Sequence, residues 1–572
     1  MRSRPDKRQA ILAANAPINA TLRPVVADSV GRDGTEGAFD SENLYIEGDN
    51  LDVLKLLQET YLGKVKMIYI DPPYNTGNDA FVYDDDFAMA GGDFVAANVP
   101  YDEHGNMVYD FKKNLDSNGR FHTDWLNMIY PRLKVAKSLL ADDGVIFISI
   151  DDSEQENLKK VCNEIFGEQN FIAELVWERA FSPKNDAKYI SNSHDYVLMY
   201  ARDINSFQIG RLPRTEEANA RYQNPDNDPR GVWMSSDISV KTYSVENDYQ
   251  IIAPSGRVIE PPAGRCWSLS KNKFLERLHD NRIWFGEDGD GVPRIKRFLS
   301  ELKHDGLTPT SILFYKDVGH SQEGAKEVTQ LFDAGVFDGP KPVRLLTRLL
   351  TLANLKKDSI VLDFFSGSAA TGHALMARNA EDGGHRKFIM VQLPEATDEG
   401  GTAYKAGYRN ICEIGKERIR RAGAKIAAEA GEKAAELDLG FRCLRLDTSN
   451  MTDVYYAPDA VTQDGLFAQV DNVKADRTPE DLLVQTMLDL GILLSASIVV
   501  EEIAGKRVFN VADGFLLACF DRAVTDETVT AIAKRKPYYA VFRDASMADD
   551  SALTNFDQLF AAYSPATVRR VL

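Results

Sequence analysis

Apolar residues divide the chain into two blocks of alternating strand-like and helix-like patterns, with a different segment between them. Val65–Ile70 is a short, mostly apolar run rich in aromatic and β-branched residues, which is typical of a buried strand. Between Asp124 and Leu140 apolar residues recur every three or four positions, which predicts a helix, and Val145–Ile150 predicts the next strand. Strands that alternate with helices in this order indicate an α/β fold.

Similar patterns extend the first block on both sides. Asn43–Glu47 predicts a strand, and a helix is expected to follow through Leu51–Leu57, so a strand, a helix and the strand at 65–70 form one unit. Further strands are predicted at 171–177 and 196–200. We expect all of these strands to continue one parallel sheet.

Between residues 205 and 340 the alternation stops. Gly, Pro, Asn and Asp punctuate short segments such as Asn224–Trp233 and Gly291–Phe298, in which Arg and Lys stand beside Trp and Phe. Loops of this composition suit contacts with the grooves and backbone of a nucleic acid, although each side chain taken alone is more often structural. The pattern therefore predicts a separate, inserted domain.

The alternating pattern returns after residue 340. Ser359–Asp363 predicts a buried strand, Phe388–Val391 another, and Tyr408–Ala430 a long charged helix. The chain is predicted to have five parts: an N-terminal arm (1–42), the first half of an α/β domain (43–204), the inserted domain (205–340), the second half of the α/β domain (341–446) and a C-terminal α/β domain (447–572).

A long loop at about 75–120 interrupts the first block. It is dense in Gly, Asp and Asn and has no helical or strand periodicity. Loops of this length are commonly functional or disordered, so a lid over a ligand and a disordered segment are both consistent with the pattern.

The strand at 65–70 leads directly into Asp71-Pro72-Pro73-Tyr74, at the carboxyl end where α/β sheets carry their active sites. Two consecutive prolines stiffen the backbone, so the carbonyl groups of Asp71 and Pro72 project as acceptors beside a flat aromatic ring. The exocyclic amine of a nucleobase becomes nucleophilic when acceptors bind its N–H groups and favour a tetrahedral nitrogen. Tyr74 would stack on a base flipped from the duplex. A rigid turn without catalytic function is the alternative.

A second motif follows the strand at 359–363. Phe364–Ser368 leads through Gly367 into a helix, and a glycine turn at this place lets the backbone approach an anionic or zwitterionic ligand. Gly367 and Gly372 have the spacing of a phosphate-binding P-loop, but His373-Ala374 stands where Lys-Ser/Thr would bind phosphate and Mg²⁺. The turn therefore does not indicate a nucleoside triphosphatase.

Composition adds few constraints. The formal net charge is −19, but residues 211–344 carry 19 basic and 20 acidic side chains, so this block is the least acidic and permits a nucleic-acid partner. Five scattered cysteines without Cys-x-x-Cys spacing indicate neither a disulfide framework nor a metal site. The sequence has no signal segment and no apolar stretch of membrane-spanning length, so we expect a cytoplasmic protein without a membrane partner.

Together, Asp71–Tyr74 and Asp363–Ser368 resemble the motif pair of S-adenosylmethionine-dependent DNA amino-methyltransferases. The order of catalytic motif, recognition block and cofactor motif resembles their β class. Four segments resemble the modification (Mod) subunits of type III restriction–modification systems: Lys341–Leu346, Asn227–Trp233, Gly291–Phe298 and Phe441–Met451. The resemblance implies a Rossmann-like, seven-stranded methyltransferase sheet in which the strands before Asp71 and Asp363 are neighbours. It also implies a target-recognition domain at 205–340 and a C-terminal domain that supports a homodimer.

The activity implied by the resemblance is transfer of a methyl group from S-adenosylmethionine to N6 of a flipped adenine in a specific sequence of double-stranded DNA. Asp at position 71 favours adenine N6, because members that modify cytosine N4 more often carry Ser there. The implied catalytic residues are Asp71, Pro72, Pro73 and Tyr74. The implied cofactor-binding residues are Asp49, Lys341, Asp363, Phe364, Phe365, Ser366, Gly367, Ser368 and Gln392.

Two positions depart from the family pattern. Ala369 stands where the cofactor turn usually has Gly, which should make the loop slightly less free. Gln392 stands where an acidic ribose ligand is common, and since an amide also bonds a ribose hydroxyl, we expect altered affinity and not its loss.

Other functions stay open at this level. N4-cytosine or RNA methylation would use the same motifs, and a non-catalytic subunit could deliver a restriction partner to specific DNA. The chain has no helicase motif and no recognisable nuclease site, so DNA cleavage would require a separate restriction (helicase–nuclease) subunit. A solitary methyltransferase is the other arrangement consistent with the sequence.

Overall fold

The computed structural model describes residues 7–77, 114, 120–183, 185, 187–302, 306–452, 473–543 and 550–572. The loop predicted at 75–120 lies almost entirely outside the described residues. The chain forms two compact units, one made of residues up to Gly210 together with those from Thr310 onward, and one made of Arg211–Pro309. The second unit spans fewer residues than the inserted domain predicted at 205–340, because residues 310–340 belong to the first unit.

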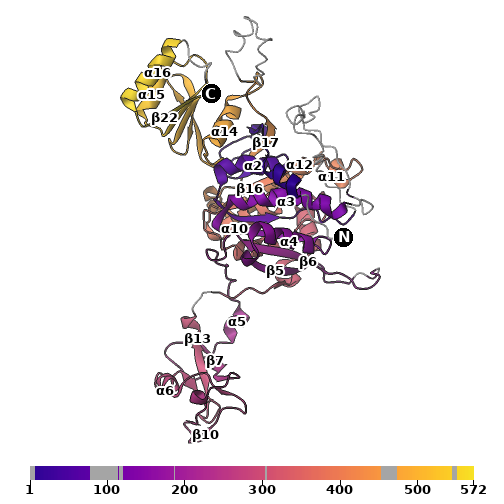
Figure 1. Ribbon diagram of the computed structural model, residues 1–572, viewed down its shortest axis with the longest axis vertical. Helices are drawn as coiled ribbons and strands as arrows, with labels where there is room; N and C mark the ends of the chain where they lie inside the picture. The colour runs from indigo at the N-terminus through magenta and orange to yellow at the C-terminus, as the bar shows by residue number, and fades with distance from the viewer. Residues whose placement is uncertain are drawn as a thin grey trace. The chain divides into compact units, whose positions relative to one another are not determined.

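A ten-stranded sheet forms the middle of the first unit (Figure 1). Its seven central strands match in number the sheet that the family resemblance implies, and three more strands extend its two edges. The strand order is β1 (Ala20–Pro24), β17 (Arg442–Thr448), β2 (Leu44–Glu47), β16 (Lys387–Gln392), β15 (Ile360–Asp363), β3 (Val65–Ile70), β4 (Leu140–Ile150), β6 (His194–Ala201), β5 (Phe171–Glu178) and β14 (Ile312–Leu313).

The sheet is not entirely parallel. β6 runs antiparallel to both β4 and β5, so the expectation that all strands up to residue 200 continue one parallel sheet is wrong for this strand. β15 pairs in parallel with β3, which confirms that the strands before Asp363 and Asp71 are neighbours. β16 and β2 follow on one side of this pair and β4 on the other, so the strand order reverses there and the sheet has its switch point between β15 and β3.

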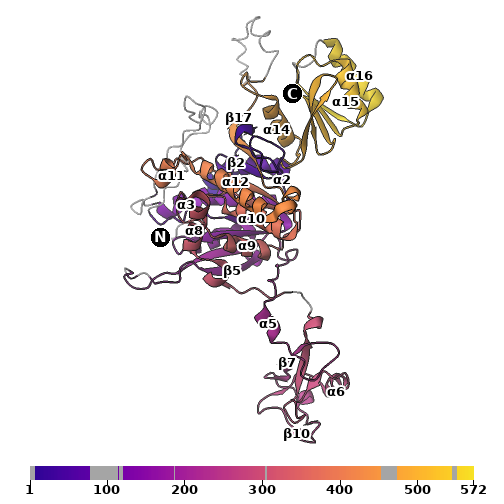
Figure 2. The same ribbon diagram turned by 180° about the vertical axis from the view of Figure 1, so that it is seen from behind.

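Helices cover both faces of the sheet. α2 (Asn50–Tyr61), α3 (Phe121–Leu139) and α4 (Gln155–Phe166) lie on one face (Figure 1). α8 (Ser321–Phe332), α9 (Val343–Leu352), α10 (Ala370–Asp382) and α12 (Ile411–Ala430) lie on the other (Figure 2). α9 illustrates why the helices pack in this way, because its buried side chains form one apolar stripe at helical spacing. The stripe contains Leu345, Leu346, Leu349 and Leu350. Shorter helices are α7 (Tyr315–Val318) and α11 (Thr402–Lys405), and the 3₁₀ turns are Val26–Asp28, Glu168–Asn170, Val245–Asn247, Leu299–Glu301 and Gly431–Glu436.

Residues 7–42 contribute a strand to the sheet, so this described part of the chain is not a separate N-terminal arm. They contain α1 (Lys7–Asn15) and β1, which pairs antiparallel with β17. The Arg23 guanidinium on β1 binds the carboxylates of Asp447 and Asp481, each at 3.0 Å. Sequence periodicity could not show this pairing, because a five-residue edge strand contains too few positions to establish a pattern.

The second unit is built from short elements around a small apolar core that includes Trp267, Phe274 and Phe285. Lys296 is fully buried, and its ammonium bonds the carboxylates of Asp226 and Asp228. The elements are α5 (Glu216–Ala220), β7 (Trp233–Asp237), β8 (Ser239–Val240), β9 (Ile251–Ile252), β10 (Val258–Ile259), β11 (Cys266–Trp267), α6 (Lys271–His279), β12 (Ile283–Trp284) and β13 (Arg294–Phe298).

The C-terminal part of the first unit carries its own five-stranded sheet, in sequence order from β18 to β22. The α/β pattern predicted from the sequence is present here. Phe542, Phe556 and Phe560 pack together between this sheet and its helices. The elements are α14 (Pro479–Asp489), β18 (Ile498–Ile503), β19 (Lys506–Val511), β20 (Leu516–Cys519), α15 (Asp526–Lys534), β21 (Tyr539–Phe542), α16 (Asp550–Tyr563) and β22 (Val568–Val571). Among the described helices, none combines the length and apolar character needed to span a bilayer.

Candidate active site

The sequence motifs meet at the carboxyl edge of the central strands. Asp71 directly follows β3, Asp363 ends β15, and Gln392 ends β16. Asp49 lies two residues after β2 and caps α2 by accepting the N–H groups of Leu51 and Asp52. Because β15 and β3 flank the switch point of the sheet, these side chains surround the crevice where α/β folds bind their ligands.

The Asp71 carboxylate is held by two side chains. The Tyr74 hydroxyl donates to Asp71 Oδ1 at 2.9 Å, and Lys341 Nζ lies 2.5 Å from Oδ2. The Lys341 ammonium also lies 5.2 Å from the centre of the Tyr74 ring and 6.0 Å from that of Trp177. Lys341, which the sequence resemblance assigned to the cofactor, therefore contacts the predicted catalytic carboxylate directly.

Burial and the charge of Asp71 raise the pKa of the Tyr74 phenol well above its ordinary value. The phenol thus stays neutral and keeps its proton as a donor to Asp71. This bond fixes the orientation of the ring beside the carboxylate, which is the arrangement that stacking on a base would require.

The side chain of Asn75, a buried residue outside the sequence motifs, fixes the backbone directly after Asp71–Tyr74. Asn75 has a left-handed backbone, with φ of 62°, and its amide donates to Glu154 Oε1 at 2.6 Å. Glu154 is fully buried and also lies 2.5 Å from His122 Nδ1. On the other side, the Trp125 indole donates to the Pro73 carbonyl at 2.7 Å. The only sequence signal was the position of Glu154, four residues after a central strand.

The Asp363 carboxylate is buried at the end of β15. It accepts a hydrogen bond from the Thr371 hydroxyl at 2.6 Å and another from the Phe365 N–H at 3.2 Å. Burial raises the pKa of the Asp363 carboxyl to about 7, even though both hydrogen bonds favour its ionised form, and the nearby Asp71 charge acts in the same direction as burial. A cationic ligand placed against this carboxylate would lower that pKa again.

The turn after Asp363 has a constrained backbone. Gly367 has φ of 49°, its N–H donates to Gln392 Oε1 at 2.7 Å, and a Cβ at this position would lie 3.1 Å from the Phe337 ring. Ala369 also has a left-handed backbone, with φ of 58°, although it carries a Cβ. The family pattern has Gly at this position, and the structure shows why, since only Gly adopts this conformation without strain.

Two further side chains reach this edge from the antiparallel pair. Trp177 on β5 and Asp195 on β6 face each other in register, and Asp195 forms an ion pair with Arg179 at 2.9 Å. Burial raises the pKa of the Asp195 carboxyl to about 6, while the positive charges of Arg179 and Lys341 oppose this shift. Sequence reasoning missed Asp195, because β6 was expected to run parallel and its first residues would then lie at the opposite edge. It also missed Trp177, which ends a predicted strand but belongs to no motif.

The family model of a DNA methylase matches residues 65–420, which include both motifs and the segment between them. The chain belongs to this DNA methylase family. The Mod subunit of the type III restriction–modification enzyme StyLTI from Salmonella typhimurium is 39% identical over 417 residues, which cover 71% of this chain and 61% of that subunit. The EcoPI Mod subunit of Escherichia phage P1 is 34% identical over 497 residues, 80% of this chain and 74% of that subunit.

Solved structures similar to this methylase include the complex of M1.HpyAVI with SAM. It is 13% identical and has a TM-score of 0.27, and the similarity covers 66% of this chain and 98% of that one.

In the methylase, the predicted cofactor residues differ in their surroundings. Arg132 binds the Asp49 carboxylate at 2.9 Å, and Arg418 donates to the Ser368 hydroxyl at 2.8 Å inside the protein. Phe364 is buried and its carbonyl accepts from Asn50 at 2.8 Å. By contrast, Phe365 is half-buried, and the buried Ser366 hydroxyl has no partner among the described residues. The geometry therefore favours Asp363, Phe365, Ser366, Gly367 and Gln392 as the residues nearest a ligand.

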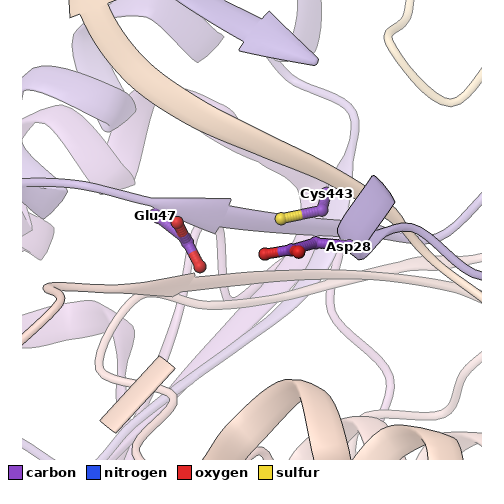
Figure 3. Close-up of side chains that lie close together, drawn as sticks. All are labelled: Asp28, Glu47 and Cys443. Carbon is purple, nitrogen blue, oxygen red and sulfur yellow. The ribbon is translucent and has the colours of Figure 1, made fainter. Parts of the chain in front are cut away.

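One other cluster of acidic and sulfur ligands lies beside β2 and β17. Asp28, Glu47 and Cys443 come within 4.8 Å of one another (Figure 3). The Lys416 ammonium bonds both carboxylates, and Arg445 binds Glu47 at 3.0 Å. Because these cations already neutralise the carboxylates, the chemistry of the cluster is that of a buried ion-pair network.

Gln392 offers a direct test of the cofactor turn. Replacing Gln392 with Ala removes the acceptor of the Gly367 N–H, and we expect the dissociation constant for S-adenosylmethionine to rise about tenfold. Gln392→Glu keeps an oxygen in this place and should retain most of the affinity. Isothermal titration calorimetry measures both variants, and equal affinities of Gln392→Ala and the unmodified protein would contradict a function of this bond in cofactor binding.

Proposed function

We propose that this methylase transfers the methyl group of S-adenosylmethionine to N6 of an adenine flipped out of double-stranded DNA, in the cytoplasm. The observation that carries the proposal is the position of Asp71 at the switch point. Its carboxylate stands next to the aromatic ring of Tyr74, and it is held there by a hydrogen bond and an ion pair. The relatives named as type III Mod subunits support the same activity, and the sequence criterion at position 71 favours adenine.

Asp71 and Pro72 supply the acceptors that this reaction needs. None of the described residues donates a hydrogen bond to the Pro72 carbonyl, so this oxygen is available for one N–H of the amine, and the Asp71 carboxylate for the other. Binding both N–H groups favours a tetrahedral nitrogen with a localised lone pair and stabilises the positive charge that develops there. Tyr74 stacks on the base and holds it in the plane that these acceptors define.

The residues around Gly367 fit the proposed cofactor. The buried hydroxyl of Ser366, which has no partner among the described residues, offers a hydrogen bond, and the Phe337 ring lies close enough to Gly367 to crowd a side chain at the turn. The high pKa of Asp363 suits a cationic or zwitterionic ligand. S-adenosylmethionine supplies the methyl group when bound. The chain itself orients the amine through Asp71, whose position depends on Lys341.

The pKa of Asp363 predicts how cofactor binding depends on pH. We expect the dissociation constant for S-adenosylmethionine to rise as pH falls below about 7, by up to about tenfold per pH unit, because the cationic ligand prefers the ionised carboxylate. The cofactor-free fold responds in the opposite direction, since a raised pKa stabilises the folded state at low pH and this stabilisation is lost as pH rises through 7. Calorimetric titrations between about pH 6 and 8 measure the first effect.

Asp363→Asn is the matched control, because an amide has no proton to lose in this range. Its affinity for the cofactor should be weaker than that of the unmodified protein and nearly independent of pH. A pH dependence that persists in Asp363→Asn would assign the titration to another group.

We further propose that Arg211–Pro309 reads the DNA sequence, and that the methylase is a homodimer that pairs with a restriction subunit. The near-neutral charge of the middle of the chain supports the first statement, and the relatives named as Mod subunits of restriction–modification enzymes support a restriction partner. The family resemblance of the sequence supports the homodimer. Light scattering after size-exclusion chromatography measures the oligomeric state. A monomeric mass in the presence of DNA would contradict the homodimer.

The activity is tested by mass spectrometry of nucleosides from unmethylated DNA incubated with the protein and S-adenosylmethionine. We expect N6-methyladenine. N4-methylcytosine would instead assign the enzyme to the other amine, and methylation of RNA alone would exclude DNA as the substrate. Binding of DNA without any methylated nucleoside would favour a non-catalytic specificity subunit.

A further inference from the structure

A hairpin arm, residues 179–193, joins β5 to β6 and starts at the carboxyl edge of the sheet, where the candidate active site lies. The ribbon continues beyond the two strands as a narrow arm away from the sheet (Figures 1 and 2). Its two most exposed large apolar side chains are Tyr189, at 84%, and Ile190, at 89%. Neither residue belongs to a family motif described above, and neither contributes to the core.

The base of the arm is tied to the active site. The N–H groups of Arg179 and Ala180 both donate to the Ser193 carbonyl, at 3.0 and 3.2 Å. The Arg179 guanidinium pairs with Asp195, and Trp177, two residues earlier, lies beside the ammonium of Lys341. Any force on the arm therefore acts on strands that contact the pair formed by Lys341 and Asp71.

A stack of rings stiffens the base of the arm. Phe181 lies 5.5 Å from both the Tyr315 and His320 rings, and these two rings lie 5.8 Å apart. The interplanar angles are 31°, 27° and 24°, so the three rings are nearly parallel. Phe181 is nevertheless 55% exposed. The arm thus leaves the sheet in a direction set by packing at its base.

The tip combines apolar surface with positive charge. The Lys188 ammonium lies 5.0 Å from the centre of the Tyr189 ring. The arm contains three basic residues, Arg179, Lys184 and Lys188, and one acidic residue, Asp186, in a chain whose net charge is −19. Exposed aromatic and aliphatic side chains next to basic residues suit a nucleic acid, because phosphates bind the cations while bases stack on the rings.

We propose that Tyr189 and Ile190 insert into the DNA beside the target base and occupy the stack that this base leaves when it is flipped. The inference rests on the proposed function and adds the residues that hold the duplex open. Apolar side chains that enter between base steps are an established way to unstack DNA. Tyr189 is six residues from Asp195, so the tip extends at most about 20 Å from the active-site edge, a distance comparable to the width of a duplex.

The test compares three variants of the full-length protein on a duplex whose methylated site has been mapped with the unmodified enzyme. Tyr189→Ala/Ile190→Ala should lower kcat/KM for DNA by about ten- to a hundredfold, because stacking on one aromatic ring accounts for a factor of this size. Tyr189→Phe keeps the ring and should retain most of the activity. Leu62→Ala is the control, since Leu62 is 61% exposed but lies in the turn before β3, at the opposite edge of the sheet.

A second readout separates insertion from simple surface contact. With 2-aminopurine in place of the target adenine, the unmodified enzyme should enhance fluorescence on binding, and Tyr189→Ala/Ile190→Ala should lose most of this enhancement at saturating protein. The affinity for S-adenosylmethionine and the thermal unfolding midpoint should not change, because both side chains are exposed. Loss of the cofactor affinity or of folding would assign the residues a structural function and overturn the proposal.

Three other outcomes would also overturn it. The double variant could keep full activity and full fluorescence enhancement, or it could bind DNA more weakly while each bound complex still flips the base. A change of oligomeric state in the double variant would identify the tip as a protein interface. Failure of the unmodified enzyme to methylate any DNA would instead contradict the proposed function, and this is seen before any variant is compared.

Discussion

Replacing Asp71 with Asn is expected to lower the rate of methyl transfer to DNA by at least about a hundred- to a thousandfold. The amide keeps the shape of the side chain but replaces one carboxylate oxygen with a donor, which cannot accept an N–H of the target amine. It also removes the ion pair with Lys341. DNA binding should be largely unchanged, since Asp71 acts on a base that has already left the duplex.

Transfer of the labelled methyl group from S-adenosylmethionine measures the rate, and fluorescence anisotropy measures DNA binding. Asp358→Asn is the matched control, because Asp358 is exposed and precedes β15 at the opposite end of the strand from Asp363. Its activity should equal that of the unmodified protein. Full activity in Asp71→Asn would exclude the proposed acceptor function and would shift attention to Asp195 as the carboxylate that contacts the substrate.

Replacing Lys296 with Met is expected to lower the free energy of unfolding of the second unit by about 3 to 5 kcal/mol. The Lys296 ammonium is the shared partner of Asp226 and Asp228, and the Asp228 side chain is fully buried. Without the ammonium, both carboxylates lose a partner, and water does not replace it at the fully buried Asp228. Specific DNA binding should then be lost, because Arg211–Pro309 is the proposed recognition unit.

Hydrogen exchange of the full-length protein, followed by mass spectrometry, resolves the two units separately. In the Lys296→Met variant, the amide hydrogens throughout 211–309 should exchange faster, and the exchange of the other residues should not change. Arg297→Met is the matched control, since Arg297 is the neighbouring cation on β13 but is exposed, and surface substitutions of this kind typically change stability by less than about 0.5 kcal/mol. Equal exchange in Lys296→Met and Arg297→Met would show that the buried pair does not stabilise the unit.

The residues around Lys296 also show that the sequence of a single segment does not reveal whether its side chains contact DNA or stabilise the fold. Arg230, Trp233 and Lys296 lie in segments whose composition suits DNA contacts. In the structure, Arg230 binds Asp228 at 2.8 Å and Lys296 stacks over the Trp233 ring at 5.2 Å. These side chains hold the second unit together, so the structural alternative considered for them is the one observed. Composition alone does not separate the two functions, because both use cations beside aromatic rings.

Several features of this methylase could be predicted from local sequence alone. The strands before Asp71 and Asp363 were recognisable because both are buried on two sides and therefore mostly apolar, which leaves a strong signal in a few residues. The two motifs that follow them were recognisable because proline and glycine restrict or free the backbone in ways that few other residues do. The membership of the family and the α/β class follow from these short segments.

The tertiary structure decided which side chains meet. Lys341 lies 270 residues from Asp71 in the sequence and yet forms its ion pair. Glu154, Trp177 and Asp195 reach the same edge because β4 and β5 end there and β6, which runs antiparallel, begins there. Strand direction and the pairing of distant strands depend on packing across the whole sheet, and no window of local sequence contains that information. The sequence therefore determined the proposed catalytic carboxylate and its neighbouring turn, and the fold alone determined the charges and hydrogen bonds that hold them in place.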